Sequence, residues 1–427
     1  MRRIITILSV FSFFFMMAGA QSEAGTSRKI TVDEAVLLTA DNNISLRRQR
    51  INVDLLEQRS TSSWNSVSPS ASISGSLTKP FGENSSGFSY SFGATISLSF
   101  TPSLFTSIKD AKLRFESGKT SYEDALRQIE LNVRKLFYSL LYAKESIALQ
   151  NRNMETARIR YENNRDKYER GQLSELDLFQ SQYAYESMRP SIEAAEISYQ
   201  NNIASFKQML GIPQREGIEL EGSLTDAIPP ESFSVDKSLE DIPSVKRIMD
   251  SIEQQKNSLL ATRFSAYGPS LSASYSYGKS GNSKVSDLQT QNSLSLSMRI
   301  PLDGYLPWSN GALSISNQKA ALEDLELQLE DELTNAELSL ANSVKNIILQ
   351  QSQMELMDRN VEMAQRSYDM TLAAYNYGSR DLLTLQNAAD SLMKARLDRA
   401  SHIYNLICAV LDLENMLGVP FGSLGNE

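Results

Sequence analysis

The chain has 427 residues, a formal net charge of −9 and a single cysteine, Cys408. The acidic balance argues against a basic surface for nucleic acid, and one cysteine excludes a disulfide within the chain. The length is enough for two domains. Neither the composition nor any motif indicates a bound cofactor.

The first twenty residues are typical of a secretory signal peptide. Two arginines precede an apolar run that ends at Met17, and the small residues Ala18-Gly19-Ala20 follow it. The run is shorter than the roughly 20 residues that a membrane-spanning helix needs. We therefore expect residues 1–20 to be a cleaved signal peptide and the protein to be exported. A retained N-terminal anchor is the alternative.

An internal repeat organises the rest of the chain. Residues 157–213 align without a gap with residues 364–420, at an offset of 207. The matched pairs include Tyr161 with Tyr368, Tyr168 with Tyr375, Gly171 with Gly378 and Leu178 with Leu385. A unit of about 200 residues is too long for a solenoid repeat. The pattern predicts two duplicated halves, 21–213 and 238–427, joined by a linker at 214–237 in the middle of the molecule.

Each half carries two expected strands. Apolar residues alternate with serine, glycine or threonine over about 68–79 and 87–100, and again over about 269–278 and 291–301. An exposed edge of a soluble hairpin usually carries lysine or glutamate, which are nearly absent here. Strands of roughly 9–11 tilted residues cross a membrane with apolar side chains outward. We predict four membrane-spanning strands; soluble hairpins are the alternative.

Long helices are expected around the strands. They cover about 31–66, 104–170, 172–210, 238–266, 312–377 and 379–417, with tight turns near Gly171 and Gly378. Apolar residues spaced by three and four from Leu126 to Ile147 predict a coiled-coil seam. At about 1.5 Å per residue, helices 104–170 and 312–377 each run roughly 100 Å to a glycine turn. The shorter helices combine to similar lengths, so we expect four helical columns that continue the four strands.

Four strands cannot close a barrel, and lipid does not tolerate an open sheet edge. Because the smallest membrane barrels have eight strands, we predict that at least two chains share one barrel, whose helical columns then form a tube. The polar turns 80–86 and 279–289 are expected outside the cell. Arg299, in the polar register of the fourth strand, is expected to face the lumen as an ordinary solvated part of the wall.

In this order the features resemble the TolC-like outer-membrane efflux protein family, over essentially the whole mature length. The resemblance rests on the duplicated helix–strand–strand–helix–helix plan, and on three motifs: Tyr168-Glu169-Arg170-Gly171, Tyr375-Asn376-Tyr377-Gly378 and the Leu-Gly-Ile/Val-Pro that ends each repeat. It implies a mostly α fold with membrane β structure. The homotrimer would have one shared twelve-stranded barrel, continued by a long coiled-coil α-helical tunnel in the periplasm.

The resemblance also implies a function and partners. Such proteins are exit ducts in the outer-membrane lipid, with their helical tunnel in the periplasm. They dock to a periplasmic adaptor (membrane fusion) protein and to an inner-membrane efflux pump or ABC exporter, in tripartite efflux or type I secretion systems. The sequence does not indicate the cargo or the class of pump.

A periplasmic gate is implied as well. Asp177 matches the family's constricting aspartate, Tyr375 its gating tyrosine, and Arg380 the arginine two residues after the glycine. Three copies of Asp177 on the symmetry axis would attract cations, while Tyr375 and Arg380 could tether one helical hairpin to its neighbour. A solvated surface carboxylate is the alternative for Asp177.

The chain departs from the family pattern beside this gate. Thr384 and Asn387 stand where family members can carry aspartates, so the acidic constriction is expected to be thinner. For Tyr168, Gly171 and Gly378 we expect a structural role in the tip turns.

Nothing in the sequence predicts catalysis. The only histidine, His402, lies within an expected helix with no second histidine or cysteine nearby for a metal, and no glycine-rich phosphate loop follows a strand. We predict that the protein is not an enzyme and has no cofactor or metal site. The alternative to a duct is a periplasmic coiled-coil adaptor or scaffold without a membrane barrel, which would leave the four alternating segments unexplained.

Overall fold

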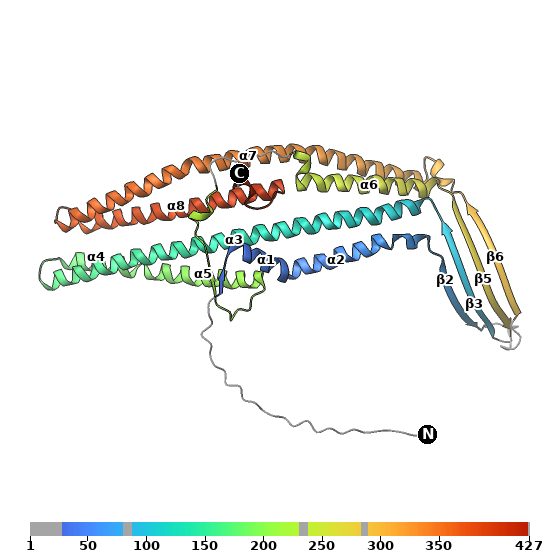
Figure 1. The fold of residues 1–427 in the computed structure, drawn as a ribbon, viewed down its shortest axis with the longest axis horizontal. Coiled ribbons are helices and arrows are strands. Elements are labelled where there is room, and N and C mark those ends of the chain that lie inside the picture. The colour runs from blue at the N-terminus through green and yellow to red at the C-terminus, as the bar shows by residue number, and fades with distance from the viewer. Residues whose placement is uncertain (1–27, 80–87, 230–237, 283–288, 426–427) are drawn as a thin grey trace, which may run out of the picture.

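The computed structural model describes residues 28–79, 88–229, 238–282 and 289–425. The expected signal peptide and the expected turn at 80–86 lie outside these ranges, as do parts of the expected turn at 279–289 and of the linker. The described chain is an elongated set of long helices with a sheet at one end (Figure 1).

The sheet is built by both halves of the chain. It consists of β2 (Ser70–Thr78), β3 (Ser89–Phe100), β5 (Ser270–Asn282) and β6 (Gln289–Arg299). All neighbours are antiparallel, in the order β2-β3-β5-β6. The two hairpins therefore meet along β3 and β5, and β2 and β6 are the edges.

β5 is longer than predicted. Its pairing continues beyond Gly278, with Ser280 opposite Gln289 on β6 and Gly281 opposite Tyr90 on β3. The first residues of the segment predicted as an outer turn, 279–282, are thus part of a strand, because both neighbouring strands offer partners at this level. The prediction that this turn begins at residue 279 is wrong.

The alternation of residue types gives the sheet two different faces. On one face serine hydroxyls bond across strands, each pair 2.7 Å apart, as in Ser76–Ser91 and Ser276–Ser293. The opposite face is apolar and uncovered, and Ile73 on β2 is 91 % exposed. An exposed apolar face on a sheet whose other face is polar is the pattern of strands that contact lipid.

The helices of the first half are α1 (Val32–Asn42), α2 (Ile44–Thr61), α3 (Ser103–Glu169), α4 (Glu175–Glu186) and α5 (Arg189–Leu210). The single helix predicted for 31–66 is wrong, because Asn43 has an extended backbone and its side chain accepts hydrogen bonds from the first turn of α2. The return helix is likewise interrupted at Ser187–Met188, since Pro190 fits only the first turn of α5.

The second half contains α6 (Pro243–Tyr267), α7 (Asn310–Asn376) and α8 (Leu382–Leu417). α6 begins later than the predicted residue 238, because a proline fits only the first turn of a helix. α3 and α7 have 67 residues each, which corresponds to about 100 Å. None of the described helices combines the length and apolar character needed to cross a bilayer.

The helices form four columns. Near the sheet they lie side by side in the order α2, α3, α6, α7, the same order as the strands to which they connect. Farther away, α3 contacts α4 and α5 on one side and α8 on the other, and α7 packs along α8. α2 and α7 are therefore the edge helices in the half next to the sheet.

The main core lies midway along the columns, where α1, α3, α5 and α8 meet. Its buried members include Ile30, Val133, Phe137, Phe206, Leu210 and Leu224. A short parallel pair, β1 (Arg28–Ile30) with β4 (Ile218–Leu220), closes this region. β4 lies inside the segment predicted as a linker. Sequence reasoning missed this pair, because strands of three residues carry no periodic signal.

Candidate functional site

The tip of the first hairpin is a tight turn between α3 and α4. Gly171 has φ +73° and its N–H donates to the Tyr168 carbonyl at 2.8 Å, a left-handed helix end that favours glycine. Ser174 then caps α4. Its Oγ accepts from the Asp177 N–H at 3.1 Å and donates to Asp177 Oδ2 at 2.7 Å.

The tip of the second hairpin repeats this backbone between α7 and α8. Gly378 has φ +76° and its N–H donates to the Tyr375 carbonyl at 2.9 Å. Asp381 caps α8, and its Oδ1 accepts from both the N–H and the Oγ1–H of Thr384. These hydrogen bonds, led by the hydroxyl of Thr384, hold the pKa of Asp381 below its usual value.

The hydroxyl and the carboxylate have exchanged positions between the two helix caps. The repeat offset places Ser174 on Asp381 and Asp177 on Thr384, so a hydroxyl–carboxylate pair becomes a carboxylate–hydroxyl pair. The carboxylate absent from position 384 is therefore present three residues earlier. Sequence reasoning missed Asp381, although the repeat alignment, which places it opposite a serine N-cap, carries the signal.

Tyr375 joins the two hairpins within one chain. Its hydroxyl donates to Asn164 Oδ1 at 3.0 Å, and the Lys167 ammonium lies 5.6 Å from the centre of its ring. Asn164 is only 1 % exposed, and its Nδ2 has no hydrogen-bond partner in the described structure. The interaction of Tyr375 with a deeply buried amide therefore fixes α7 against α3 close to the tip.

The other predicted gate residues are not part of this contact. Asp177 is partly buried, and its side chain bonds only to Ser174 among the described residues. Arg380 is exposed, with no hydrogen bond or ion pair to any described residue. Of the two residues predicted to tether the hairpins, Tyr375 forms such a contact, and it forms it within one chain. Arg380 forms no such contact within the described chain.

Weaker links join the hairpins nearby. Arg160 Nη2 donates to the Tyr368 hydroxyl at 3.5 Å, between α3 and α7. Gln386 Nε2 donates to the Gln180 carbonyl at 3.5 Å, between α8 and α4. With Tyr375, they show that polar groups join the hairpins at the tip, beside the buried Leu382 and Leu385 on α8.

His402 has a structural hydrogen bond. Its Nε2 lies 2.8 Å from the Gln350 carbonyl on α7, and it lines a surface hollow that also includes Cys408 and Asp412. Cys408, six residues farther along α8, lines the same hollow. Within the described part of the chain, no group of three potential metal ligands occurs.

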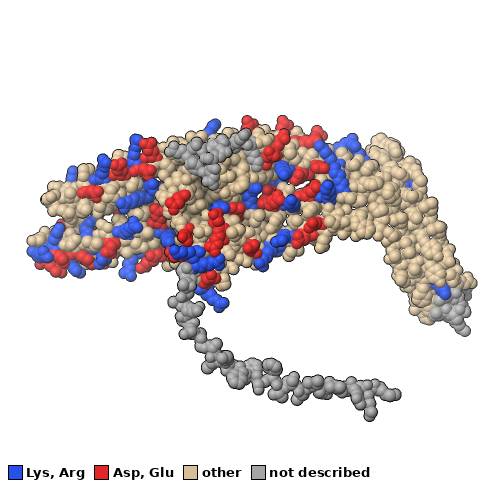
Figure 2. All heavy atoms as spheres, in the orientation of Figure 1, with Lys and Arg blue, Asp and Glu red and all other residues tan. Residues whose placement is uncertain are grey.

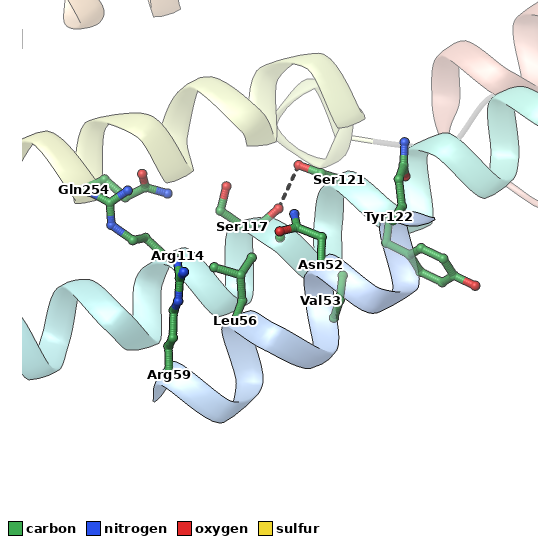
Figure 3. Close-up of a pocket in the computed structure, with 11 residues that line it drawn as sticks. Asn52, Val53, Leu56, Arg59, Arg114, Ser117, Ser121, Tyr122 and Gln254 are labelled. Atoms are coloured by element: carbon green, nitrogen blue, oxygen red, sulfur yellow. Dashed lines mark hydrogen bonds between the residues drawn. The ribbon is translucent and has the colours of Figure 1, made fainter. Parts of the chain in front are cut away.

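A second hollow, of about 430 Å³, lies where α2 crosses α3 beside α6 (Figure 3). Leu56 points toward α3, where a Cβ added to Gly118 would come within 2.5 Å of its Cδ1. Arg114 at its rim is paired with Asp110 at 2.6 Å. The hollow is open to the surface, and it results from the close packing of α2 against α3 at Gly118.

The comparisons with known proteins decide the family. The model of the outer membrane efflux protein family matches residues 39–212 and 255–419, which together make up most of the chain. The chain belongs to this family. No match was found among curated protein sequences.

Solved structures share the fold at low sequence identity. CusC is 15 % identical, with a TM-score of 0.79 over 91 % of this chain and 92 % of its own. CmeC from Campylobacter jejuni is 16 % identical, with a TM-score of 0.74 over 98 % and 94 %. The open state of MtrE from Neisseria gonorrhoeae is 16 % identical, with a TM-score of 0.74 over 91 % and 89 %.

These matches confirm the predicted family and its mostly α, duplicated fold. The protein is an outer-membrane exit duct for efflux, with its helical part in the periplasm. This family consists of channels rather than enzymes. The alternative of a coiled-coil adaptor or scaffold without membrane strands receives no support.

Proposed function

We propose that three copies of this chain form one continuous duct, which receives substrates from a periplasmic adaptor and an inner-membrane pump. The observation that carries the proposal is the sheet. Its edge strands β2 and β6 pair with no further strand among the described residues, and one of its faces is apolar throughout its central part. Since open edges are not tolerated in lipid, neighbouring copies must supply the missing partners.

The helices support side-by-side assembly in the same order. On the edge helix α7, the exposed residues Leu349, Leu356, Met363 and Met370 follow a seven-residue spacing. On α2, Ile44 and Ile51 are also exposed and lie seven residues apart, and Leu37 on α1, before the break at Asn43, is exposed as well. Apolar residues at this spacing form a coiled-coil seam, and these stripes lack a partner within the described chain. Neighbouring copies would bury them.

Light scattering with detergent subtraction tests the assembly. We expect the mass of three protomers. Leu356→Lys combined with Met363→Lys should weaken the trimer, whereas Arg366→Lys, an exposed change of the same helix, should leave it intact. A monodisperse monomer that keeps its full β-sheet signal contradicts the proposal.

We infer that the tips of the helices gate the duct. Tyr375 supports this role through its link between α3 and α7. Asp177 and Arg380 follow the two glycine turns on opposite hairpins. Within one chain Arg380 is exposed and Asp177 is partly exposed, so each is available to a neighbouring copy. Gly171 and Gly378 supply the turns. Asp381 adds a carboxylate to the same level.

Docking of the adaptor would use the same end. Large apolar side chains are exposed there, among them Leu176, Tyr183, Tyr377 and Leu383. Tyr377→Asp combined with Leu383→Asp should abolish co-purification with an adaptor and pump expressed in the same cells, while the trimer persists. Unchanged co-purification would place the docking surface elsewhere.

A further inference from the structure

The polar face of the sheet is almost free of charge. It comprises the alternate residues Ser70–Thr78, Ser89–Ser99, Ser270–Ser280 and Gln289–Arg299, as fixed by the strand registers. Sixteen of these twenty-three residues are serine, and six are threonine, glycine or glutamine. The remaining one is Arg299.

This face lines the inside of the closed barrel. The opposite face carries exposed leucine, isoleucine and aromatic side chains, which belong against lipid. Figure 2 shows charged side chains spread along the helices and almost none on the visible side of the sheet. A solute inside the barrel therefore meets hydroxyl groups nearly everywhere.

Arg299 lies at one end of this neutral wall. It is the last residue of β6, paired with Ser270 at the end of the sheet nearest the helices. Its side chain is exposed and forms no ion pair with the side chains that the structure describes. The first charges on α3, the helix that follows β3, are paired, Asp110 with Arg114 at 2.6 Å and Lys109 with Glu253 at 3.1 Å. Arg299 is thus a positive charge, at the junction of barrel and tunnel, that no described side chain pairs.

We propose that Arg299 from each copy forms a cationic ring at this junction, and that the ring binds anionic solutes and favours their passage. The inference rests on the proposed shared barrel, which brings the copies into one ring. Rings of arginine act as filters for anions in pores. Because the other described residues of this polar face carry no charge, none of them cancels the charge of the ring. Cargo with phosphate, sulfate or carboxylate groups is the class that it would hold.

Planar-bilayer recording of the purified protein tests the proposal in two ways. The chloride-to-potassium permeability ratio is taken from the reversal potential across a potassium chloride gradient. Inorganic triphosphate is then added on the extracellular side, from which it reaches the ring without crossing the tip. At low salt, where the screening length is 10 Å or more, Arg299→Ser should lower the permeability ratio and weaken block by triphosphate, each by about threefold. Both effects should shrink in 1 M salt.

Two controls isolate the ring. Arg299→Lys keeps the charge and should keep both properties. Lys279→Ser removes the same charge from the apolar face of β5, where Lys279 pairs with Phe92 and Thr290, and should change neither property. Equal effects of Arg299→Ser and Lys279→Ser would overturn the proposal, because they would reflect net charge alone.

The outcomes separate this inference from the duct itself. Channels that form normally in every variant, with the same permeability ratio and the same block, overturn the role of Arg299 and leave the duct standing. Failure of the wild-type protein to form channels overturns both. Reduced anion preference in Arg299→Ser alone supports the ring.

Discussion

The two tip turns share one backbone but differ in chemistry. Gly171 and Gly378 have φ of +73° and +76°, and a cap follows three residues after each of them. The capping groups are exchanged, with serine in the first turn and aspartate in the second. The duplicated halves have thus kept the geometry of the turn while the side chains that produce it have changed.

The tyrosines before these turns differ more. The Tyr375 hydroxyl bonds to the buried Asn164, whereas Tyr168, its counterpart at the repeat offset, is 40 % exposed and its hydroxyl has no hydrogen-bond partner among the described residues. The conserved feature, the turn, is structural. The asymmetric feature, the link from α7 to α3, is the one we assign to gating.

Removing the asymmetric link should have the largest effect. Tyr375→Phe leaves the buried oxygen of Asn164 without a partner, which typically costs about 1–3 kcal/mol. The open-to-closed ratio should rise by about 5- to 150-fold, and further when Arg380→Ser is added. Planar-bilayer conductance of the intact trimer measures the change, and antibiotic uptake by cells should rise with it.

Tyr168→Phe is the matched control, since it removes the same hydroxyl from the other repeat. We expect its conductance to equal that of the wild type. If the double variant Tyr375→Phe with Arg380→Ser conducts like the wild type while still trimeric, the tip closes through other groups.

Replacing glycines by alanine should have a smaller effect, on the stability of the trimer. A Cβ on Gly211 would lie 2.6 Å from the Cβ of Asn42, whereas a Cβ on Gly171 would meet nothing within 4 Å. Gly171→Ala should therefore cost only the left-handed conformation, about 1–2 kcal/mol. Gly211→Ala should cost clearly more and lower the temperature of trimer unfolding further. If both substitutions lower the unfolding temperature equally, the packing around Gly211, midway along the columns, accommodates a methyl group as readily as the tip does.

The smallest effects are expected from the two helix caps, whose contributions to stability should differ in their dependence on pH. Ser174→Ala should weaken the first turn of α4 by about 1 kcal/mol at any pH. Asp381 has a pKa lowered from its ordinary 3.8, so its stabilising effect is present above that value and disappears as the pH falls through the lower folded value. The start of α8 should fray in acid.

Hydrogen exchange at the amides of Asp177 and Thr384 reports the two caps separately. Acid should lower the protection factor at Thr384, which is the intrinsic exchange rate at each pH divided by the measured rate. Asp381→Asn, which still caps but does not titrate, should abolish that fall. A fall in protection that survives Asp381→Asn would assign the pH dependence to another group.

The sequence predicted the repeat, the sheet and the long helices, because these leave periodic patterns bounded by proline and glycine. The breaks at Asn43 and Ser187 were missed, since each replaces only one or two residues of a continuous amphipathic pattern. Asn164 was also missed, because its contact joins residues 211 apart in sequence. A weak signal did exist: continued by threes and fours, the seam from Leu126 places the polar residues Gln150 and Asn164 at core positions.

The most direct test replaces the hydrogen bond between Tyr375 and Asn164 by a reversible chemical cross-link. In a Cys408→Ser background, Asn164→Cys and Tyr375→Cys remove the hydrogen bond, and a reversible bis-methanethiosulfonate then bridges the two cysteines within each chain. The account predicts high conductance before cross-linking, a fall to the wild-type value when every chain is bridged, and recovery after reduction. Conductance that stays the same throughout, with bridging verified by mass, would contradict a gate held by α3 and α7.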